Sequence, residues 1–127
     1  MIKFDSLEPG VQIGRSEIRV DAGLAETWFE LFPDGKDADL LPAGLTMALV
    51  MRAYMSMLKP HPPGNIHARQ RLRLGSPLRR GDLITTTLAC RSKQIRGERR
   101  WVTFAIDSRS EGDVMVCEGE MTVVWAA

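Results

Sequence analysis

Three aspartates, Asp34, Asp37 and Asp39, stand within six residues of one another after Pro33. A carboxylate can act as a general base when burial raises its pKa toward neutrality. Acidic loops are also common simply because loops lie in water. The segment therefore predicts one general base, with Asp34 and Asp39 as the candidates, and a solvated acidic loop is the alternative.

The two histidines stand near the middle of the chain, His61 among prolines and His67 at the start of a strand-like segment. Imidazole is the usual side-chain base near neutral pH. A strand residue beside a buried helix can line a pocket, so His67 is the stronger catalytic candidate. The alternative for either residue is an ordinary surface histidine.

Basic residues concentrate in one stretch of the chain. Residues 69 to 100 hold ten Lys or Arg and two acids, a balance of +8, whereas the remaining chain carries −7. Strand alternation predicts that His67 shares one face with the first three arginines of this stretch. Forked guanidinium groups bind phosphates through paired hydrogen bonds, so the arginines predict an anion site. The candidates are Arg69, Arg71, Arg73, Arg79 and Arg80.

The same arginines have two other interpretations. They fit the solvated outer face of an edge strand, and they fit a surface that meets an acidic partner. Nucleic acid is disfavoured, because the formal net charge of the whole chain is only +1 and no aromatic residues alternate with the arginines to stack on bases.

Neither cysteine belongs to a metal-binding spacing. Cys90 and Cys117 each lie in a strand-like segment, so buried, unreactive thiols are expected and no metal site is predicted. The N-terminus has no charged-then-apolar leader pattern. The longest apolar stretch, residues 44–58, contains Arg52 and is too short to span a bilayer. A cytoplasmic protein without membrane contact is therefore expected.

The elements that position these residues begin with a strand from Val11 to Val20. Asp21 is a plausible N-cap for a helix that ends near Phe32. From Gly44 to Lys59 almost every residue is apolar, which predicts a helix buried on all sides. Arg52 is the exception, and it must reach solvent, a carboxylate or a ligand anion.

The second half of the chain predicts four consecutive strands with short turns between them. Such a series is typical of an antiparallel meander. The 127 residues fit one α+β domain, 1–127. The expected strands are Ile66–Leu74, Leu83–Ile95, Arg99–Arg109 and Val114–Trp125.

Several short motifs resemble the MaoC-like acyl dehydratase family. Phe4–Gly10 is similar to the family's opening F-x-x-L-x-x-G, and Leu41–Leu45 to the start of its central helix. Pro77–Leu83 resembles its P-V-x-x-G-D-x-L turn, and Glu111–Val116 its Q-x-G-x-x-V hairpin. The resemblance implies a hot-dog fold, in which an antiparallel sheet wraps a central helix.

The resemblance also implies a ligand and an assembly. The ligand is an acyl thioester of coenzyme A or of acyl carrier protein, with the coenzyme A moiety as part of the ligand and no other cofactor held tightly. The arginines named above would then bind the phosphates of coenzyme A. Two sheets join edge to edge in this fold with ligand sites at the seam, so a homodimer, or a heteromer with another hot-dog subunit, is expected.

One departure from the family decides the functional prediction. Family hydratases carry an Asp and a His in a D-x-N-P-x-H loop before the central helix, whereas residues 34–42 here contain acids and no His. The sequence therefore predicts an acyl-thioester binding protein that lacks the hydratase residues. A divergent thioesterase or dehydratase (a lyase) using Asp34 or Asp39 with His67 is one alternative. A non-enzymatic interaction module using the basic stripe is the other.

Overall fold

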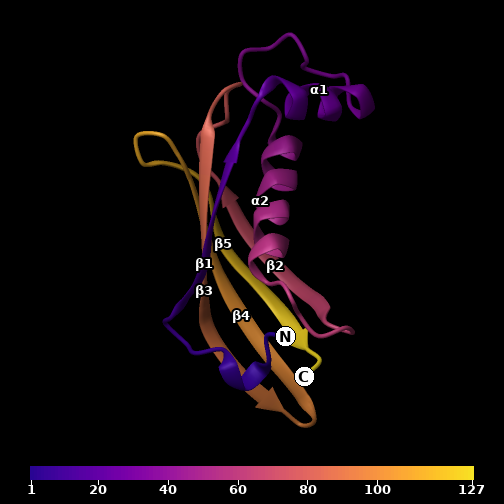
Figure 1. The fold of residues 1–127 in the computed structure, drawn as a ribbon, viewed down its shortest axis with the longest axis vertical. Coiled ribbons are helices and arrows are strands. Elements are labelled where there is room, and N and C mark those ends of the chain that lie inside the picture. Colours follow the sequence, from indigo (N-terminus) through magenta and orange to yellow (C-terminus); the bar gives the residue numbers. More distant parts are fainter.

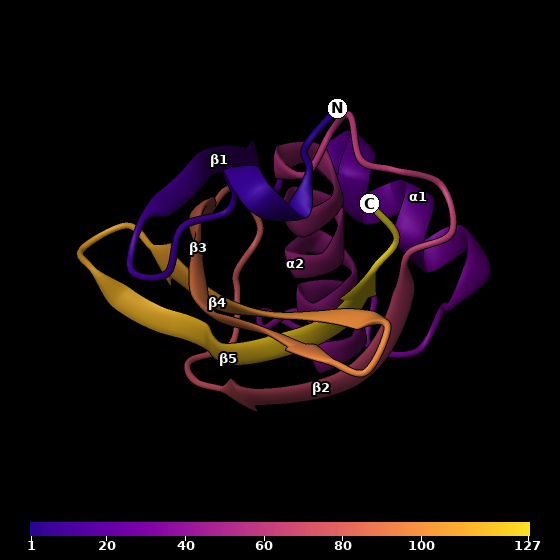
Figure 2. The ribbon, with the colours of Figure 1, turned by 90° about the horizontal axis from the view of Figure 1, so that it is seen from below.

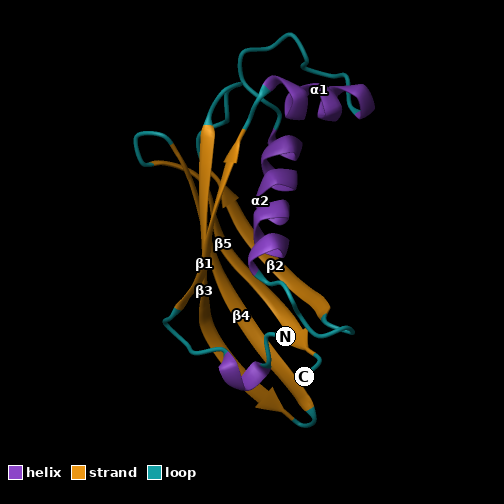
Figure 3. Cartoon of the chain, viewed as in Figure 1, coloured by secondary structure: helices purple, strands orange, loops and turns teal.

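A computed structural model describes all residues from 1 to 127. The chain forms one five-stranded antiparallel sheet in the order β1-β3-β4-β5-β2, with two α-helices (Figures 1 and 3). The prediction of a four-strand meander holds for β3, β4 and β5, which are neighbours in sequence and in the sheet, and is wrong for β2. Residues 75–82 carry the chain across the sheet, so β2 pairs with β5 and forms one edge, while β1 forms the other. The strands are β1 Gln12–Arg19, β2 Ile66–Leu74, β3 Leu83–Arg96, β4 Arg99–Ser110 and β5 Val114–Trp125.

The α+β class and the hot-dog arrangement are confirmed. The sheet curves around α2, Ala43–Met57, as Figure 2 shows from below. The shorter helix α1, Ala22–Leu31, begins where predicted, because the Asp21 side chain accepts a hydrogen bond of 2.9 Å from the Leu24 N–H. A short 3-10 turn, η1, covers Phe4–Ser6. No helix is long and apolar enough to cross a membrane.

One face of the sheet, here called the inner face, packs against α2, and the opposite face is called the outer face. The inner face buries alternate residues of β3, β4 and β5, among them Leu88, Phe104 and Met121. Phe104 connects the layers, since its ring lies 6.0 Å from Tyr54 of α2 and 5.7 Å from Trp125, in both cases edge to face. The core is thus a single cluster between helix and sheet.

The prediction that α2 is buried on every side is wrong. Ala48, Arg52 and Met55 are exposed, so one stripe of the helix faces away from the sheet. Arg52 reaches solvent on this stripe, which resolves the difficulty of a charge within an apolar helix.

The Pro77–Leu83 turn follows from backbone chemistry. Gly81 has a φ of +89°, which favours glycine, and its N–H donates to the Val20 carbonyl at 2.7 Å. The Asp82 carboxylate accepts from the Arg79 N–H at 2.8 Å and closes the turn. Leu78 is fully buried. The motif therefore joins the start of β3 to the end of β1.

A bulge in β2 overturns the predicted face of His67. The register of β2 on β5 shifts between His67 and Arg69, where Ala68 is the extra residue. His67 consequently lies opposite the buried Val123, on the inner face, while Arg69 lies opposite Thr122, on the outer face. The prediction from simple alternation is wrong here, because the extra residue Ala68 places the β2 residues before it on the opposite face of the sheet.

Candidate functional site

An apolar pocket of about 260 Å³ lies on the inner face beside the C-terminal half of α2. Its walls come from three elements that are distant in sequence: α2, the loop and start of β2 that follow it, and the end of β5. Most of its surface is apolar, with a few polar groups from Tyr54, Asn65 and the two histidines. The lining residues are Met51, Tyr54, Met55, Leu58, His61, Asn65, His67, Val123 and Trp125.

Tyr54 is the polar group most deeply placed in this pocket. Its side chain is 4% exposed, and burial raises the pKa of its hydroxyl well above the usual value of 10.0, so the group is neutral and can donate. No buried side-chain oxygen or nitrogen lacks a partner, and no hydrogen bond joins this hydroxyl to the rest of the chain. The hydroxyl is therefore not fully enclosed by the chain, and Tyr54 is one of the residues that line the pocket.

The two histidines lie at the pocket with different surroundings. The His67 ring stands edge-on to Tyr54, with ring centroids 6.3 Å apart. His61 Nδ1 lies 3.2 Å from the Pro62 carbonyl oxygen, which can only accept, so a neutral ring donates from Nδ1 and leaves Nε2 as an acceptor. The pocket thus combines an apolar cavity with one phenol hydroxyl and two imidazole rings.

A second hollow, of about 270 Å³, lies at the opposite end of α2. Leu40, Leu41 and Thr46 line it on the helix side, and Leu74 and Ser76 line it at the end of β2. The first N–H groups of α2 have no side-chain cap, because Pro42 precedes the helix. The two pockets therefore mark the two ends of β2, one at Ile66 and the other at Leu74.

The predicted aspartates do not meet His67 within the chain. Asp34 and Asp39 lie in the exposed loop between α1 and α2, at the N-terminal end of α2. His67 lies near the C-terminal end of this 15-residue helix, which is roughly 22 Å long at 1.5 Å per residue. Asp39 directly precedes Leu40 of the second hollow, so it is the better placed of the two.

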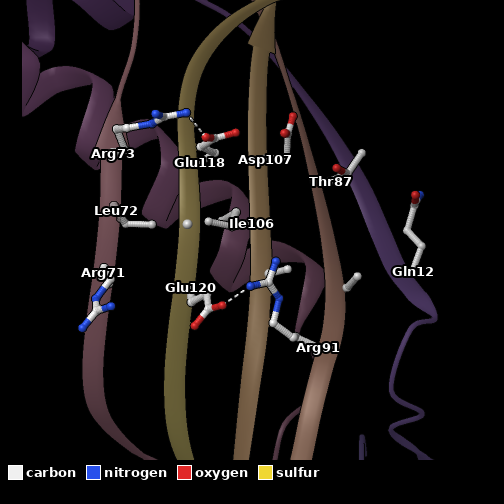
Figure 4. A pocket seen from close by; sticks show the side chains of 13 residues that line it. Gln12, Arg71, Leu72, Arg73, Thr87, Arg91, Ile106, Asp107, Glu118 and Glu120 are labelled. Carbon is white, nitrogen blue, oxygen red and sulfur yellow. Dashed lines mark hydrogen bonds and ion pairs between the residues drawn. The ribbon is translucent and has the colours of Figure 1, made fainter.

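The predicted arginines divide into two groups. Arg69, Arg71 and Arg73 lie on the outer face, with the sheet between them and the apolar pocket. Arg73 pairs with Glu118 and Arg91 with Glu120, whereas Arg71 points away from Glu120 (Figure 4). These residues rim a hollow of about 540 Å³ floored by Ala89, Ala105 and Thr87.

The other two arginines stabilise local structure. Arg80 Nη1 donates to the Ala38 carbonyl at 2.9 Å, Nη2 donates to that of Lys36, and the guanidinium lies 5.2 Å from the Phe29 ring centroid. Arg80 thereby fixes the aspartate loop. Arg79 forms an isolated bridge with Leu40 and is exposed. The structure does not gather the five arginines around one point.

The positions of the potential metal ligands and of the two thiols do not favour metal binding or thiol chemistry. No three His, Cys, Asp or Glu side chains stand close enough to hold a metal ion. Cys90 and Cys117 are buried and unpaired, as predicted. Burial raises the pKa of both thiols, which disfavours the reactive thiolate.

Solved structures with the same fold cover nearly the whole chain. The MaoC-like dehydratase from Rhodospirillum rubrum aligns with a TM-score of 0.82 and 19% identity, over 100% of this chain and 99% of that one. The R-hydratase PhaJ1 from Pseudomonas aeruginosa aligns with a TM-score of 0.78 and 18% identity, over 98% and 85%. The chain has the hot-dog fold of these enzymes.

A third hot-dog structure is a variant of the fluoroacetyl-CoA-specific thioesterase FlK in complex with fluoroacetate and CoA. It aligns with a TM-score of 0.67 and 17% identity, over 93% of this chain and 94% of that one. No protein-family model matches the sequence, and no curated protein matches it. At these identities the likeness establishes the fold.

Tyr54 is a pocket residue that the sequence pattern did not predict. It is the one tyrosine of the chain and stands in a stretch where almost every residue is apolar, although it carries a hydroxyl. A buried tyrosine usually places its O–H against a partner, so a polar tip within an apolar helix was the available signal. The free hydroxyl itself becomes visible only once the packing is known.

Proposed function

We propose that this protein binds an acyl thioester of coenzyme A or of acyl carrier protein and does not hydrate it in the manner of the MaoC-like dehydratases. The observation that carries the proposal is the apolar pocket with the free Tyr54 hydroxyl, set between the central helix and sheet of a hot-dog fold. An acyl chain suits the methionine-lined walls, because thioethers adapt to irregular apolar shapes. A thioester carbonyl suits a neutral phenol donor.

The related structures support this ligand class. The FlK variant holds fluoroacetate and CoA, and another FlK variant was solved with acetyl-CoA. The absence of a histidine from residues 34–42 separates this chain from a D-x-N-P-x-H hydratase. Binding without hydration follows if no other group supplies the missing acid–base chemistry. A cytoplasmic location belongs to the same proposal.

The proposal includes assembly through β2, as a homodimer or with another hot-dog subunit. β2 is an edge strand of nine residues, so its outer edge offers unpaired backbone groups to another strand. Antiparallel pairing of two β2 strands would set Leu74 of one subunit beside Ile66 of the other. The hollow at the N-terminus of α2 would then meet the apolar pocket of the partner, and the two would form one longer cavity.

The test is isothermal titration of the purified protein with coenzyme A, a short acyl-CoA and a long acyl-CoA, with sedimentation to give the mass in solution. We expect affinity to rise with acyl length, by up to about fourfold for each buried methylene. Hydration and hydrolysis assays on the same sample should show no efficient hydration of an enoyl-CoA. Rapid hydration by the isolated protein would refute the non-hydrating function.

A pocket-filling variant locates the binding. Met51→Trp should reduce the affinity for the long acyl-CoA toward that for coenzyme A alone. Ile95→Trp is the matched control, because Ile95 is 64% exposed in β3 and lies outside the pocket. Equal affinity in both variants would place acyl binding elsewhere.

A thioesterase or dehydratase using a loop carboxylate is a second candidate. Asp39 beside the second hollow favours it, since pairing through β2 would bring that hollow toward the His67 of the other subunit. If hydrolysis of an acyl-CoA is detected, Asp39→Ala and His67→Ala should each abolish it. Mixing the two inactive variants should restore part of the activity through mixed dimers. Unchanged turnover in both variants would remove these assignments, and Asp34→Ala tests the remaining aspartate.

A further inference from the structure

The outer face of the sheet divides electrostatically into two halves. Over most of it, arginines are paired with acids on the same face or in the turn between β4 and β5. The ion pairs are Arg15–Glu17, Arg19–Glu111, Arg73–Glu118, Arg91–Glu120 and Arg109–Asp107. Toward the β3–β4 hairpin the pattern changes, because Arg69, Arg71 and Arg96 form no ion pair with any acid of the chain. An excess of positive charge therefore collects at one end of the face.

These three arginines surround one concavity of about 290 Å³. We name it the outer basic hollow. It is distinct from the apolar pocket, which opens on the inner face. Glu120 is its one acid, and that carboxylate is already paired with Arg91. The lining residues are Ala68, Arg69, Arg71, Ser92, Gln94, Arg96, Trp101, Thr103, Glu120 and Thr122.

Short polar side chains and an oriented guanidinium complete the hollow. The Thr103 and Thr122 hydroxyls are 3.3 Å apart on neighbouring strands. The Arg96 guanidinium lies 4.9 Å from the Trp101 ring centroid. With its amide oxygen turned toward Arg96, Gln94 accepts hydrogen bonds of 2.8 and 3.0 Å from Nη2 and Nε. Arg96 is thus held in place before any ligand arrives, while Nη1 stays free to donate.

We propose that the outer basic hollow binds the phosphate group of a small phosphorylated ligand. Guanidinium forks match phosphate oxygens with paired, charge-assisted hydrogen bonds, and hydroxyl groups supply further donors. Arg96 occupies a face of the only aromatic ring in the hollow, so stacking of a nucleotide base contributes little. The phosphate, rather than a base, is the recognised group.

The outer basic hollow is separate from the acyl pocket, and it gives Arg69 and Arg71 a different role from the one predicted. The sheet separates Arg69 and Arg71 from the apolar pocket, so the hollow binds its ligand independently of the acyl chain. Two sources of the phosphate share this chemistry: a free organic or inorganic phosphate, and the phosphates of a coenzyme A molecule whose acyl chain lies elsewhere. The experiment separates them.

The probe is inorganic pyrophosphate, titrated at low ionic strength into the wild-type protein and into Arg69→Ala, Arg71→Ala and Arg96→Ala. Each substitution should weaken binding by about tenfold or more, as expected for loss of a charge-assisted hydrogen bond. Arg15→Ala is the matched control: Arg15 lies on the same sheet but pairs with Glu17 at 2.9 Å, and pyrophosphate affinity should stay unchanged. Thermal unfolding of each variant establishes that it is folded.

Two outcomes would overturn the proposal. One is the absence of pyrophosphate binding to the wild-type protein at low salt. The other is an equal loss in Arg15→Ala and in the three variants of the hollow, since this would reflect net charge alone. Neither result would argue against acyl binding in the apolar pocket. Titration with an acyl-pantetheine, which lacks the phosphates of coenzyme A, tests that pocket separately.

A competition assay identifies the source of the phosphate. Displacement of pyrophosphate by coenzyme A, together with a loss of coenzyme A affinity in Arg71→Ala that matches its loss of pyrophosphate affinity, would assign the hollow to the coenzyme's own phosphates. Simultaneous binding of both would assign it to a separate phosphorylated ligand. Both results support a phosphate site and differ only in what fills it.

Discussion

The ring of His67 stands at 89° to the ring of Tyr54, with centroids 6.3 Å apart, at the wall of the apolar pocket. The contact depends on the bulge in β2, which turns His67 toward α2 and leaves the following arginines on the other face. The imidazole therefore stands perpendicular to the phenol that we propose as the carbonyl donor, and both rings line the same cavity.

Replacing the Tyr54 hydroxyl tests its role as a donor. Because no hydrogen bond joins this hydroxyl to the rest of the chain, Tyr54→Phe should leave the free energy of unfolding almost unchanged. Acyl-CoA affinity should fall by roughly two- to tenfold, the contribution of about 0.5–1.5 kcal/mol from one neutral hydrogen bond. Titration calorimetry and urea unfolding measure the two effects. Unchanged affinity would show that the ligand carbonyl lies elsewhere.

Gly119 is required by the close approach of two strands. A Cβ at this position would overlap the carbonyl oxygen of Arg71 and the Cα of Leu72 in β2. Gly119→Ala should therefore destabilise the protein by about 2–3 kcal/mol or detach β2 from the sheet. Gly23→Ala in α1 is the control, because its new Cβ meets nothing closer than 3.6 Å. Equal unfolding midpoints for the two variants would contradict this account of the β2–β5 contact.

A buried pair of hydroxyls links β3 to β4. Thr86 Oγ1 and Ser108 Oγ are 2.8 Å apart, and both residues are almost fully buried. Thr86→Val should lower stability by about 1–3 kcal/mol, because it leaves the Ser108 hydroxyl without a partner. The double variant Thr86→Val/Ser108→Ala should lose less than the sum of the two single variants, by about 0.5 kcal/mol or more. Strict additivity would mean that the two hydroxyls do not stabilise each other.

Stability should decline at alkaline pH through the thiols. Burial raises the pKa of Cys90 and of Cys117 in the folded chain, although Lys93 opposes the shift at Cys90. The unfolded chain then releases its thiol protons first as pH rises above about 8.5. The stability from the protonated thiols is thus present below that pH and is lost as pH rises toward the folded values.

Urea unfolding at a series of pH values between about 7 and 9.5 measures this loss, within the range where unperturbed thiols titrate. The double variant Cys90→Ala/Cys117→Ala should be less stable throughout, because its core has lost two sulfur atoms. Its stability should nevertheless change less with pH than that of the wild-type protein. The same slope in both proteins would assign the alkaline effect to other groups.

Local pattern determined most of the fold. Alternation placed β3, β4 and β5 to within a residue or two, because each has one face on the core and the other in water. Asp21 set the start of α1, and the Pro77–Leu83 turn followed from Gly81 and Asp82. These features depend on residues near one another in sequence, whose preferences need no distant partner.

Only the tertiary structure determined where the candidate site residues lie. The bulge at Ala68 arises from pairing with β5, so only the folded sheet separates His67 from Arg69. The same pairing, together with acids from β5, determines that Arg73 is neutralised while Arg71 is not. Which charges remain uncompensated, and which hydroxyl lies at a cavity, depends on contacts between strands and helix far apart in the chain. The sequence motifs therefore predicted a hot-dog domain, and packing decided where its candidate binding groups lie.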